Sequence, residues 1–227
     1  MNLLLPKTTS STPSAKCRFF DWRAWAVAVT LLVAAGLSIL VGARHQAQQR
    51  FFGMRLFPFK SAYDFELRGP GSQPVRLDQL HGKVVLFLFG FTHCANVCPT
   101  SLTNLAQVYQ ALTPDERKLV QVIFISVDPG RDSPQTLQQY ATSFDPSFIG
   151  LTGSKQAIDQ TVQAYGGSYE FVRGSSSAPD DYSVSHTAYA YLINRSGMLE
   201  LLYANDKLAD SERMVADIRA VLRERLN

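Results

Sequence analysis

The sequence has few cysteines and few charged side chains. Only 3 of its 227 residues are cysteine and 18% are charged, whereas 46% are hydrophobic. So few thiols exclude a small secreted scaffold held together by several disulfides. The high apolar share excludes an intrinsically disordered chain. The chain is therefore globular with a sizeable core, and each cysteine has to be explained by its own surroundings.

The larger part of the sequence also lacks an excess of basic residues. Residues 44–227 carry 18 basic and 18 acidic side chains, so the formal net charge of +3 arises in residues 1–43. Binding to a nucleic acid depends on lysines and arginines that neutralise phosphates. A neutral body without a basic stripe therefore predicts no nucleic-acid partner.

Residues 24–43 contain no charged side chain. A helix of this length spans about 30 Å, the thickness of a hydrocarbon core. We therefore predict a transmembrane anchor behind a short N-terminal segment, residues 1–23. The alternative is a cleaved signal peptide, because residues 41–43 are small, but the apolar core of a signal peptide usually has only about 7–15 residues. Basic residues flank the segment on both sides, so they do not decide its orientation.

A linker and one globular domain are predicted after this segment. Residues 44–60 show no clear periodicity, and their four phenylalanines are expected to pack under the domain rather than rest on a membrane surface. No internal repeat is visible in the remaining residues, 61–227. This range is therefore interpreted as a single domain.

Within the domain, short apolar runs alternate with helical patterns. The runs 84–89 and 122–127 predict strands buried on both faces of a parallel sheet. Helical patterns cover residues 99–112, 133–144, 155–165 and a C-terminal stripe over 214–222. Two later runs, 188–193 and 198–203, flank a turn and predict a hairpin. This order is typical of an α/β, thioredoxin-like sheet surrounded by helices.

The loop after the first buried strand contains Cys94 and Cys98, followed by Pro99. The carboxyl end of such a strand is where ligands bind, and the dipole of the following helix stabilises thiolates, so both thiols are expected to be acidic. Their separation is about one helical turn, which allows the sulfurs either to form a disulfide or to share a metal ion. The alternative is that they are two buried, apolar cysteines, which would not explain this spacing in this loop.

A third ligand is sought among the four histidines. His186 immediately precedes the predicted strand 188–193, which is expected to run antiparallel to the central strands. It would therefore begin at the edge where strand 84–89 ends, close to Cys94 and Cys98; a histidine that merely caps a loop is the alternative. The remaining histidines, at positions 45, 81 and 93, are interpreted as surface residues.

Two thiolates and one imidazole form a donor set that suits copper. Cu(I) accepts thiolates at low coordination number, and Cu(II) accepts the imidazole together with a further ligand. Structural zinc usually has four protein ligands, and the sequence offers no obvious fourth cysteine or histidine. Asp128 ends the second buried strand at the same edge of the sheet. The sequence Asp-Pro-Gly is, however, also common in turns that have no further function. We assign Asp128 at most a supporting role behind the ligands.

Four segments in this order resemble the SCO/SenC family of membrane-anchored copper-binding proteins: FGFTHCANVCPTSL, ISVDPGRDSP, IGLTG and DYSVSHTAYAYLINRSG. The resemblance covers about residues 61–225. It implies a thioredoxin-like fold, an N-terminal anchor, and copper held by Cys94, Cys98 and His186. It also implies that the protein delivers copper to the dinuclear copper site of cytochrome c oxidase, or reduces the cysteines of that site.

The sequence departs from the family pattern at two places. Ala95-Asn96 stands where the family commonly has Pro-Asp, and Ser185 stands where an acidic residue commonly precedes the histidine. The loss of two nearby negative charges is expected to weaken Cu(II) binding and to shift the thiol pKa values, although the ligand set is intact.

The resemblance also implies an orientation, because the copper domain of the family lies outside the cytoplasm. Residues 1–23 would then be cytoplasmic, with Cys17 as a reduced thiol or, alternatively, an acylation site near the inner membrane face. The N-terminus lacks an Arg- and Ser-rich transit segment. A bacterial inner membrane with a periplasmic domain is therefore preferred to a mitochondrion.

Three functions stay open. The protein is a chaperone that passes copper to an oxidase subunit or another copper carrier, a thiol-disulfide reductase whose redox pair is Cys94 and Cys98, or a copper or redox sensor. His186 favours the chaperone, because a reductase does not need a histidine at its thiol pair. A peroxidase is disfavoured, since no arginine and hydroxyl side chain are evidently placed to bind peroxide.

Overall fold

The computed structural model describes residues 22–48, 51–175, 178 and 181–224, which belong to two compact units divided after Gln48. In the first unit, helix α1 (Trp22–Gln48) contains the apolar window Trp25–Gly42, whose mean hydropathy is 2.2 and none of which is buried. By length and composition α1 can cross a membrane. The predicted cytoplasmic segment up to residue 21, including Cys17, lies outside the described residues.

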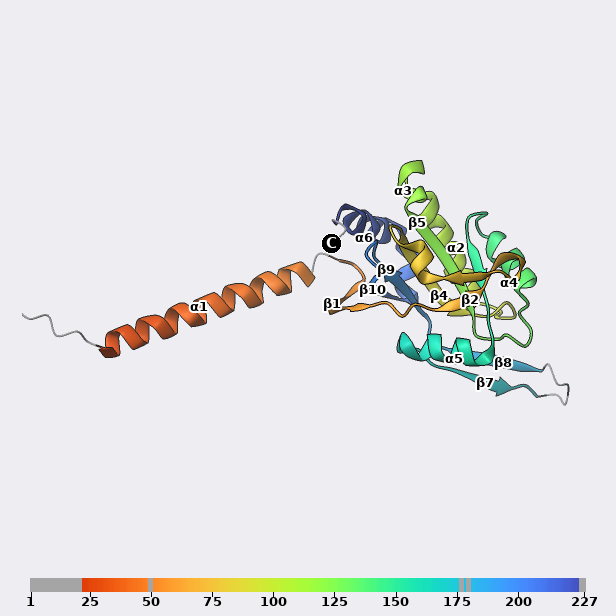
Figure 1. Cartoon of the computed structure of the whole chain (residues 1–227), viewed down its shortest axis with the longest axis horizontal. Helices are drawn as coiled ribbons and strands as arrows, with labels where there is room; N and C mark the ends of the chain where they lie inside the picture. Colours follow the sequence, from red (N-terminus) through yellow and green to blue (C-terminus); the bar gives the residue numbers. More distant parts are fainter. Residues whose placement is uncertain (1–21, 49–50, 176–177, 179–180, 225–227) are drawn as a thin grey trace, which may run out of the picture. The chain divides into compact units, whose positions relative to one another are not determined.

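The second unit is built on a six-stranded sheet with the order β1-β10-β9-β4-β5-β6 (Figure 1). Strands β4, β5 and β6 form a parallel half that ends at the edge strand β6, and β9, β10 and β1 form an antiparallel half on the other side of β4. The predicted strands and hairpin are therefore present, and β9 runs antiparallel to β4 as expected. The bounds are β1 Met54–Ser61, β4 Val84–Gly90, β5 Val120–Ser126, β6 Ile149–Leu151, β9 Tyr189–Ile193 and β10 Met198–Ala204.

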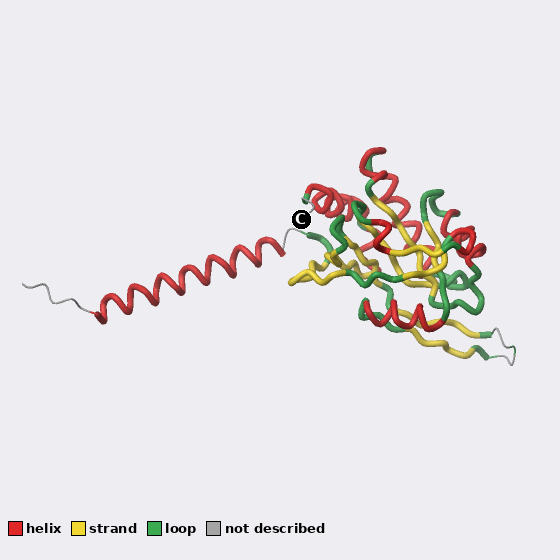
Figure 2. The backbone as a smooth tube through the Cα atoms, viewed as in Figure 1, coloured by secondary structure: helices red, strands yellow, loops and turns green. Residues whose placement is uncertain are grey.

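Helices surround this sheet (Figure 2), and four of them are the predicted ones with slightly different ends. Ser133, Ser154 and Asp210 accept backbone hydrogen bonds at the starts of α4, α5 and α6, each a cap that stabilises a helix by about 1 kcal/mol. The unpredicted short helix α3 begins with a capping box at Thr113. The helices are α2 Val97–Gln110, α3 Pro114–Lys118, α4 Pro134–Thr142, α5 Lys155–Ala164 and α6 Ser211–Arg223, with 3-10 turns η1 Pro70–Ser72, η2 Leu77–Leu80 and η3 Asn205–Ala209.

The interpretation of residues 44–60 as a linker is wrong over most of its length. Residues 44–48 continue helix α1, and β1 pairs with β10 from Met54 opposite Leu202 to Ser61 opposite Met198. The domain thus begins about ten residues earlier than predicted. The division of the chain into two compact units after Gln48 also indicates this earlier start. The signal was missed because β1 is an edge strand with a shifted register, which removes the strict alternation of a half-buried strand.

Two small hairpins lie outside the central sheet and were not predicted. One joins β2 (Glu66–Arg68) to β3 (Pro74–Arg76), and the other joins β7 (Tyr169–Arg173) to β8 (Tyr182–His186). The β7–β8 hairpin lies beside α5 (Figure 1). Most of β7 is exposed, so its sequence carries little apolar pattern, although β8 alternates in the manner of a strand.

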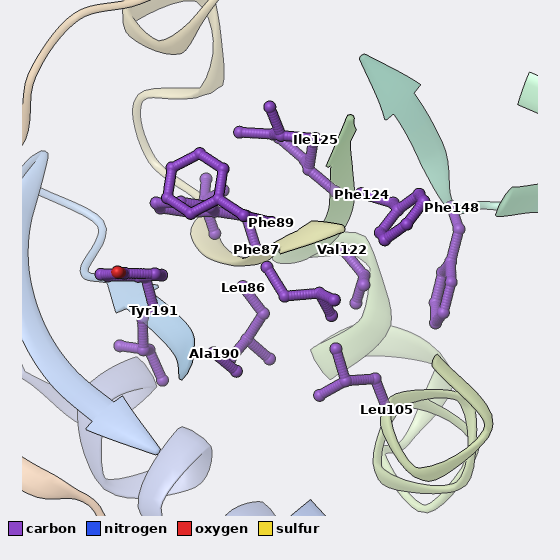
Figure 3. Packing of buried hydrophobic residues seen from close by; sticks show 14 of the residues in the cluster. Leu86, Phe87, Phe89, Leu105, Val122, Phe124, Ile125, Phe148, Ala190 and Tyr191 are labelled. Atoms are coloured by element: carbon purple, nitrogen blue, oxygen red, sulfur yellow. The ribbon is translucent and has the colours of Figure 1, made fainter. Parts of the chain in front are cut away.

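The core fills the space between the central strands and the helices (Figure 3). Phe87 of β4 stacks on Tyr191 of β9 with ring centroids 4.8 Å apart, and Leu105 of α2 and Phe124 of β5 are fully buried. Because every residue of β4 is buried, the strand has little freedom to shift. Its end at Gly90 is therefore a fixed point from which the cysteine loop starts.

Candidate metal centre

The two cysteines lie in the turn between β4 and α2. Helix α2 begins at Val97, two residues before the predicted start, so Cys98 sits in its first turn and is fully buried. Cys94 lies in the preceding loop and is partly exposed. The backbone N–H of Cys98 donates a hydrogen bond to the Cys94 sulfur over 3.4 Å. The helix start thus brings the two sulfurs together, as their one-turn spacing predicts.

Glycine at position 90 makes room for the buried sulfur. A Cβ placed on Gly90 would lie 2.4 Å from the Phe124 ring and 2.8 Å from Cys98 Sγ, closer than real Cβ contacts. A larger residue would therefore displace either the core ring or the thiol. The close approach of strand end, ring and sulfur explains why this position needs glycine.

His186 is the last residue of β8 and reaches the buried thiol. Its Nε2 lies 3.6 Å from Cys98 Sγ, and its Nδ1 lies 3.1 Å from the carbonyl oxygen of Thr187. Because a carbonyl can only accept, Nδ1 carries the proton and Nε2 presents its lone pair toward the sulfurs. Burial lowers the pKa of His186 and outweighs the opposing bond to Thr187, so the imidazole is neutral at neutral pH.

The structure brings all three predicted ligands together. Cys94 Sγ, Cys98 Sγ and a His186 ring nitrogen lie within 4.8 Å of one another, and no other such group of three occurs among the residues that the structure describes. Two sulfurs and one imidazole are the donors that suit copper. Since one metal ion can reach all three atoms after small movements, the arrangement fits the metal that the sequence predicts.

The expectation that both thiols are acidic is wrong for Cys98. Burial raises the pKa of Cys98 well above its usual value, and the neighbouring Cys94 and Asp132 act in the same direction. At Cys94, burial also acts to raise the pKa, but hydrogen bonds from Cys98 and from the amides of Asn96 and Val97 bring it below its usual value. The pair therefore combines an accessible, acidic thiol with a buried, protonated one.

The remaining histidines stay outside the cluster. His81 and His93 are exposed, as expected, and the side chain of His45 lies outside the described residues. His93 contacts the Thr92 hydroxyl rather than the sulfurs.

Two buried aspartates follow strand β5. Asp128 accepts hydrogen bonds from Tyr182 and Arg131, and its supporting role behind the ligands stays a prediction. Asp132 was not singled out, although it follows in the same segment. Its carboxylate accepts from the Thr92 amide, the Thr92 hydroxyl and the Ser126 hydroxyl, and so ties the start of the cysteine loop to the end of β5.

A family model, two solved structures and a curated relative all match most of this chain. The family model described as SCO1/SenC matches residues 55–223. Apo Sco1 from Thermus thermophilus is 45% identical with a TM-score of 0.69, and the match covers 76% of this chain and 97% of that one. ScoI from Bradyrhizobium japonicum, solved with copper bound, is 34% identical with a TM-score of 0.63 and coverages of 72% and 100%. The mitochondrial SCO2 homolog of Mus musculus is 34% identical over 197 residues, covering 84% of this chain and 76% of the mouse protein.

Proposed function

This chain belongs to the SCO1/SenC family, and we propose that it is a membrane-anchored copper chaperone for the dinuclear copper centre of cytochrome c oxidase. The observation that carries this proposal is the cluster of Cys94, Cys98 and His186, whose ligand atoms lie within 4.8 Å of one another. Support comes from the related protein of Bradyrhizobium japonicum, whose structure contains copper.

The geometry suits a protein that both holds and releases an ion. Three protein ligands leave a coordination position open, through which a donor atom of a partner can enter before the ion leaves by ligand exchange. Cys94 is the accessible ligand, whereas Cys98 is buried beneath it. A small cavity lined partly by Cys98, His186 and Tyr189 lies next to the buried ligand. A partner can thus reach the ion from the side of Cys94.

The proposed location follows from the anchor and the family. Helix α1 would hold the domain next to a bacterial inner membrane, with the domain in the periplasm and residues 1–23 in the cytoplasm. Relatives include both bacterial and mitochondrial proteins. The expected partner is the oxidase subunit that carries the copper site, or another copper carrier.

Replacing His186 with alanine is expected to weaken Cu(II) binding by about 100-fold or more and Cu(I) binding by much less. The physical reason is that two thiolates satisfy Cu(I), whereas Cu(II) prefers the imidazole and a higher coordination number; even residues that only support a ligand commonly change affinity about 10- to 100-fold. Competition titrations of the full-length protein in detergent with each ion measure the two affinities. Equal affinity of variant and wild type for Cu(II) would remove His186 from the site.

A thiol-disulfide reductase is the second candidate, and the asymmetry of the cysteines favours it. A lowered pKa makes the accessible Cys94 a competent attacking thiolate, and Cys98 is placed to resolve the mixed disulfide. Both cysteines are free thiols in the structure.

Mild oxidation of the metal-free protein is expected to join Cys94 and Cys98 in a reversible disulfide, because their one-turn spacing allows bridging and a periplasmic domain meets oxidants. Differential alkylation followed by mass spectrometry of the cysteine peptides measures it, with a reduced sample as control. If both thiols are alkylated once the oxidised protein has been unfolded, no disulfide has formed, and the reductase candidate fails while the copper proposal stands.

A further inference from the structure

The β7–β8 hairpin carries His186 but forms a separate sheet. Among the described strands, β7 and β8 pair only with each other. At the base of the hairpin, Thr187 bonds to Ser168, and on β7 the hydroxyl of Tyr169 donates to Asp159 of α5. Side-chain contacts therefore decide how the hairpin, and with it His186, lies against the cysteine loop.

A three-residue contact joins β8 to the loop after β5. The Tyr182 hydroxyl donates to Asp128 Oδ1 over 2.9 Å, and Arg131 Nε donates to Asp128 Oδ2. Arg131 also donates through a terminal nitrogen to the Tyr182 carbonyl oxygen over 3.0 Å, and its guanidinium lies 3.6 Å from the centre of the Tyr182 ring. We call Asp128, Arg131 and Tyr182 the β8 clamp.

The clamp is built to be rigid. Asp128 is 1% exposed, and the side chain of Arg131 is 12% exposed. The backbone amide of Asp128 also donates to the Ser126 hydroxyl. This bond holds the backbone of Asp128 at the end of β5. Charge-assisted hydrogen bonds in such a buried setting are stronger and better defined than surface ones.

The clamp and the histidine lie on the same face of β8. Strand geometry places Tyr182, Val184 and His186 on one face, and Val184 is buried while Ser183 and Ser185 are exposed. A bond that holds Tyr182 in place therefore also limits the rotation of β8 about its own axis, and so holds the face that carries the imidazole. The ring of Phe91, which the Arg131 guanidinium approaches to 5.8 Å, also meets the His186 ring edge-on at a centroid distance of 6.0 Å.

We propose that Asp128, Arg131 and Tyr182 are positioning residues that hold His186 at the thiol pair and thereby set the preference of the site for Cu(II) relative to Cu(I). The inference rests on the proposed copper function. It follows from two steps: the clamp fixes the face of β8 that carries the imidazole, and the imidazole matters more to Cu(II) than to Cu(I). Loosening the clamp should therefore leave the thiolate site for Cu(I) largely intact.

The test uses Tyr182→Phe in the full-length protein in detergent. This change keeps the ring beneath Arg131 but removes the hydroxyl that reaches Asp128. We expect Cu(II) affinity to fall about tenfold, the lower end of the usual effect of a residue behind a ligand, and Cu(I) affinity to change less than about twofold. The nitrogen coupling in the Cu(II) paramagnetic resonance spectrum should weaken in parallel, because it reports imidazole coordination directly.

Tyr203→Phe is the matched control. It removes the same kind of bond, from a phenol to the buried carboxylate of Asp217, but between β10 and α6. Both variants should lose some thermal stability, and only Tyr182→Phe should change the ratio of the two copper affinities. Asp128→Asn, which removes the charge facing Arg131, should shift that ratio in the same direction as Tyr182→Phe.

The outcomes separate this inference from the function on which it rests. If wild type binds both ions and Tyr182→Phe and Asp128→Asn leave the affinity ratio and the nitrogen coupling unchanged, the clamp does not position His186. Equal losses for Cu(I) and Cu(II), or the same change in Tyr203→Phe, would show general destabilisation and overturn the inference alone. A wild-type protein that binds neither ion would overturn the proposed function as well.

Discussion

Replacing Cys98 with alanine should weaken the binding of both Cu(I) and Cu(II) to the full-length protein in detergent by about 10²–10³-fold. Structural zinc sites with four ligands bind their ion with about 10–16 kcal/mol, so one lost ligand is worth about 2.5–4 kcal/mol, a weakening of about 10²–10³-fold. Unlike the histidine, a thiolate serves both oxidation states, so neither ion should be spared. Competition titration of each ion and the copper content after gel filtration measure the loss.

Two comparisons make this result specific. Cys17→Ala removes a thiol far away in the sequence and should bind copper like wild type. Thermal unfolding of the metal-free Cys98→Ala protein should show a folded domain, because alanine leaves only a small cavity where the fully buried sulfur was. A folded Cys98→Ala protein that binds both copper ions as tightly as wild type would exclude Cys98 as a ligand and overturn the proposed site.

The three predicted ligands could be placed from the sequence, the cysteines by their local pattern and His186 by the expected direction of a neighbouring strand. Cys94 and Cys98 follow an unbroken apolar run, and their spacing matches one turn of the helix that begins there. His186 could be placed because the strand that begins at Tyr189 is antiparallel to β4, which brings its start to the same edge of the sheet. The period of the sequence thus accounts for the cysteines, and the sheet topology accounts for His186.

The electrostatics and the supporting contacts could not be predicted in this way. The raised pKa of Cys98 depends on the burial of its sulfur, which lies close to Gly90 at the end of a different element. The bond between Asp128 and Tyr182 joins residues 54 positions apart, and nothing in either local sequence identifies the partner. Tertiary packing thus determines the thiol pKa values and the supporting hydrogen bonds, and these could not be predicted from the sequence.

Deleting the gene for this protein should abolish most activity of an oxidase that carries a dinuclear copper centre, with the largest loss when copper is scarce. Helix α1 is long and apolar enough to hold the domain at a membrane, and confinement there raises its effective concentration toward membrane-bound partners. At abundant copper, unassisted loading can compensate in part. Oxidase activity at graded copper concentrations in the deletion strain measures the dependence.

Complementation of the deletion strain separates the roles of the ligands and of the anchor. Wild type and Cys17→Ala should restore activity, whereas Cys94→Ser should fail at low copper because it lacks the accessible ligand. A secreted form without residues 1–43 should restore activity only when overproduced, since a higher bulk concentration replaces the effective concentration that the anchor provides. If Cys94→Ser restores activity as well as wild type at low copper, both the chaperone and the reductase functions are excluded. The protein would then act as a sensor or a structural factor, because neither role requires the thiol to exchange an ion or an electron pair with the oxidase.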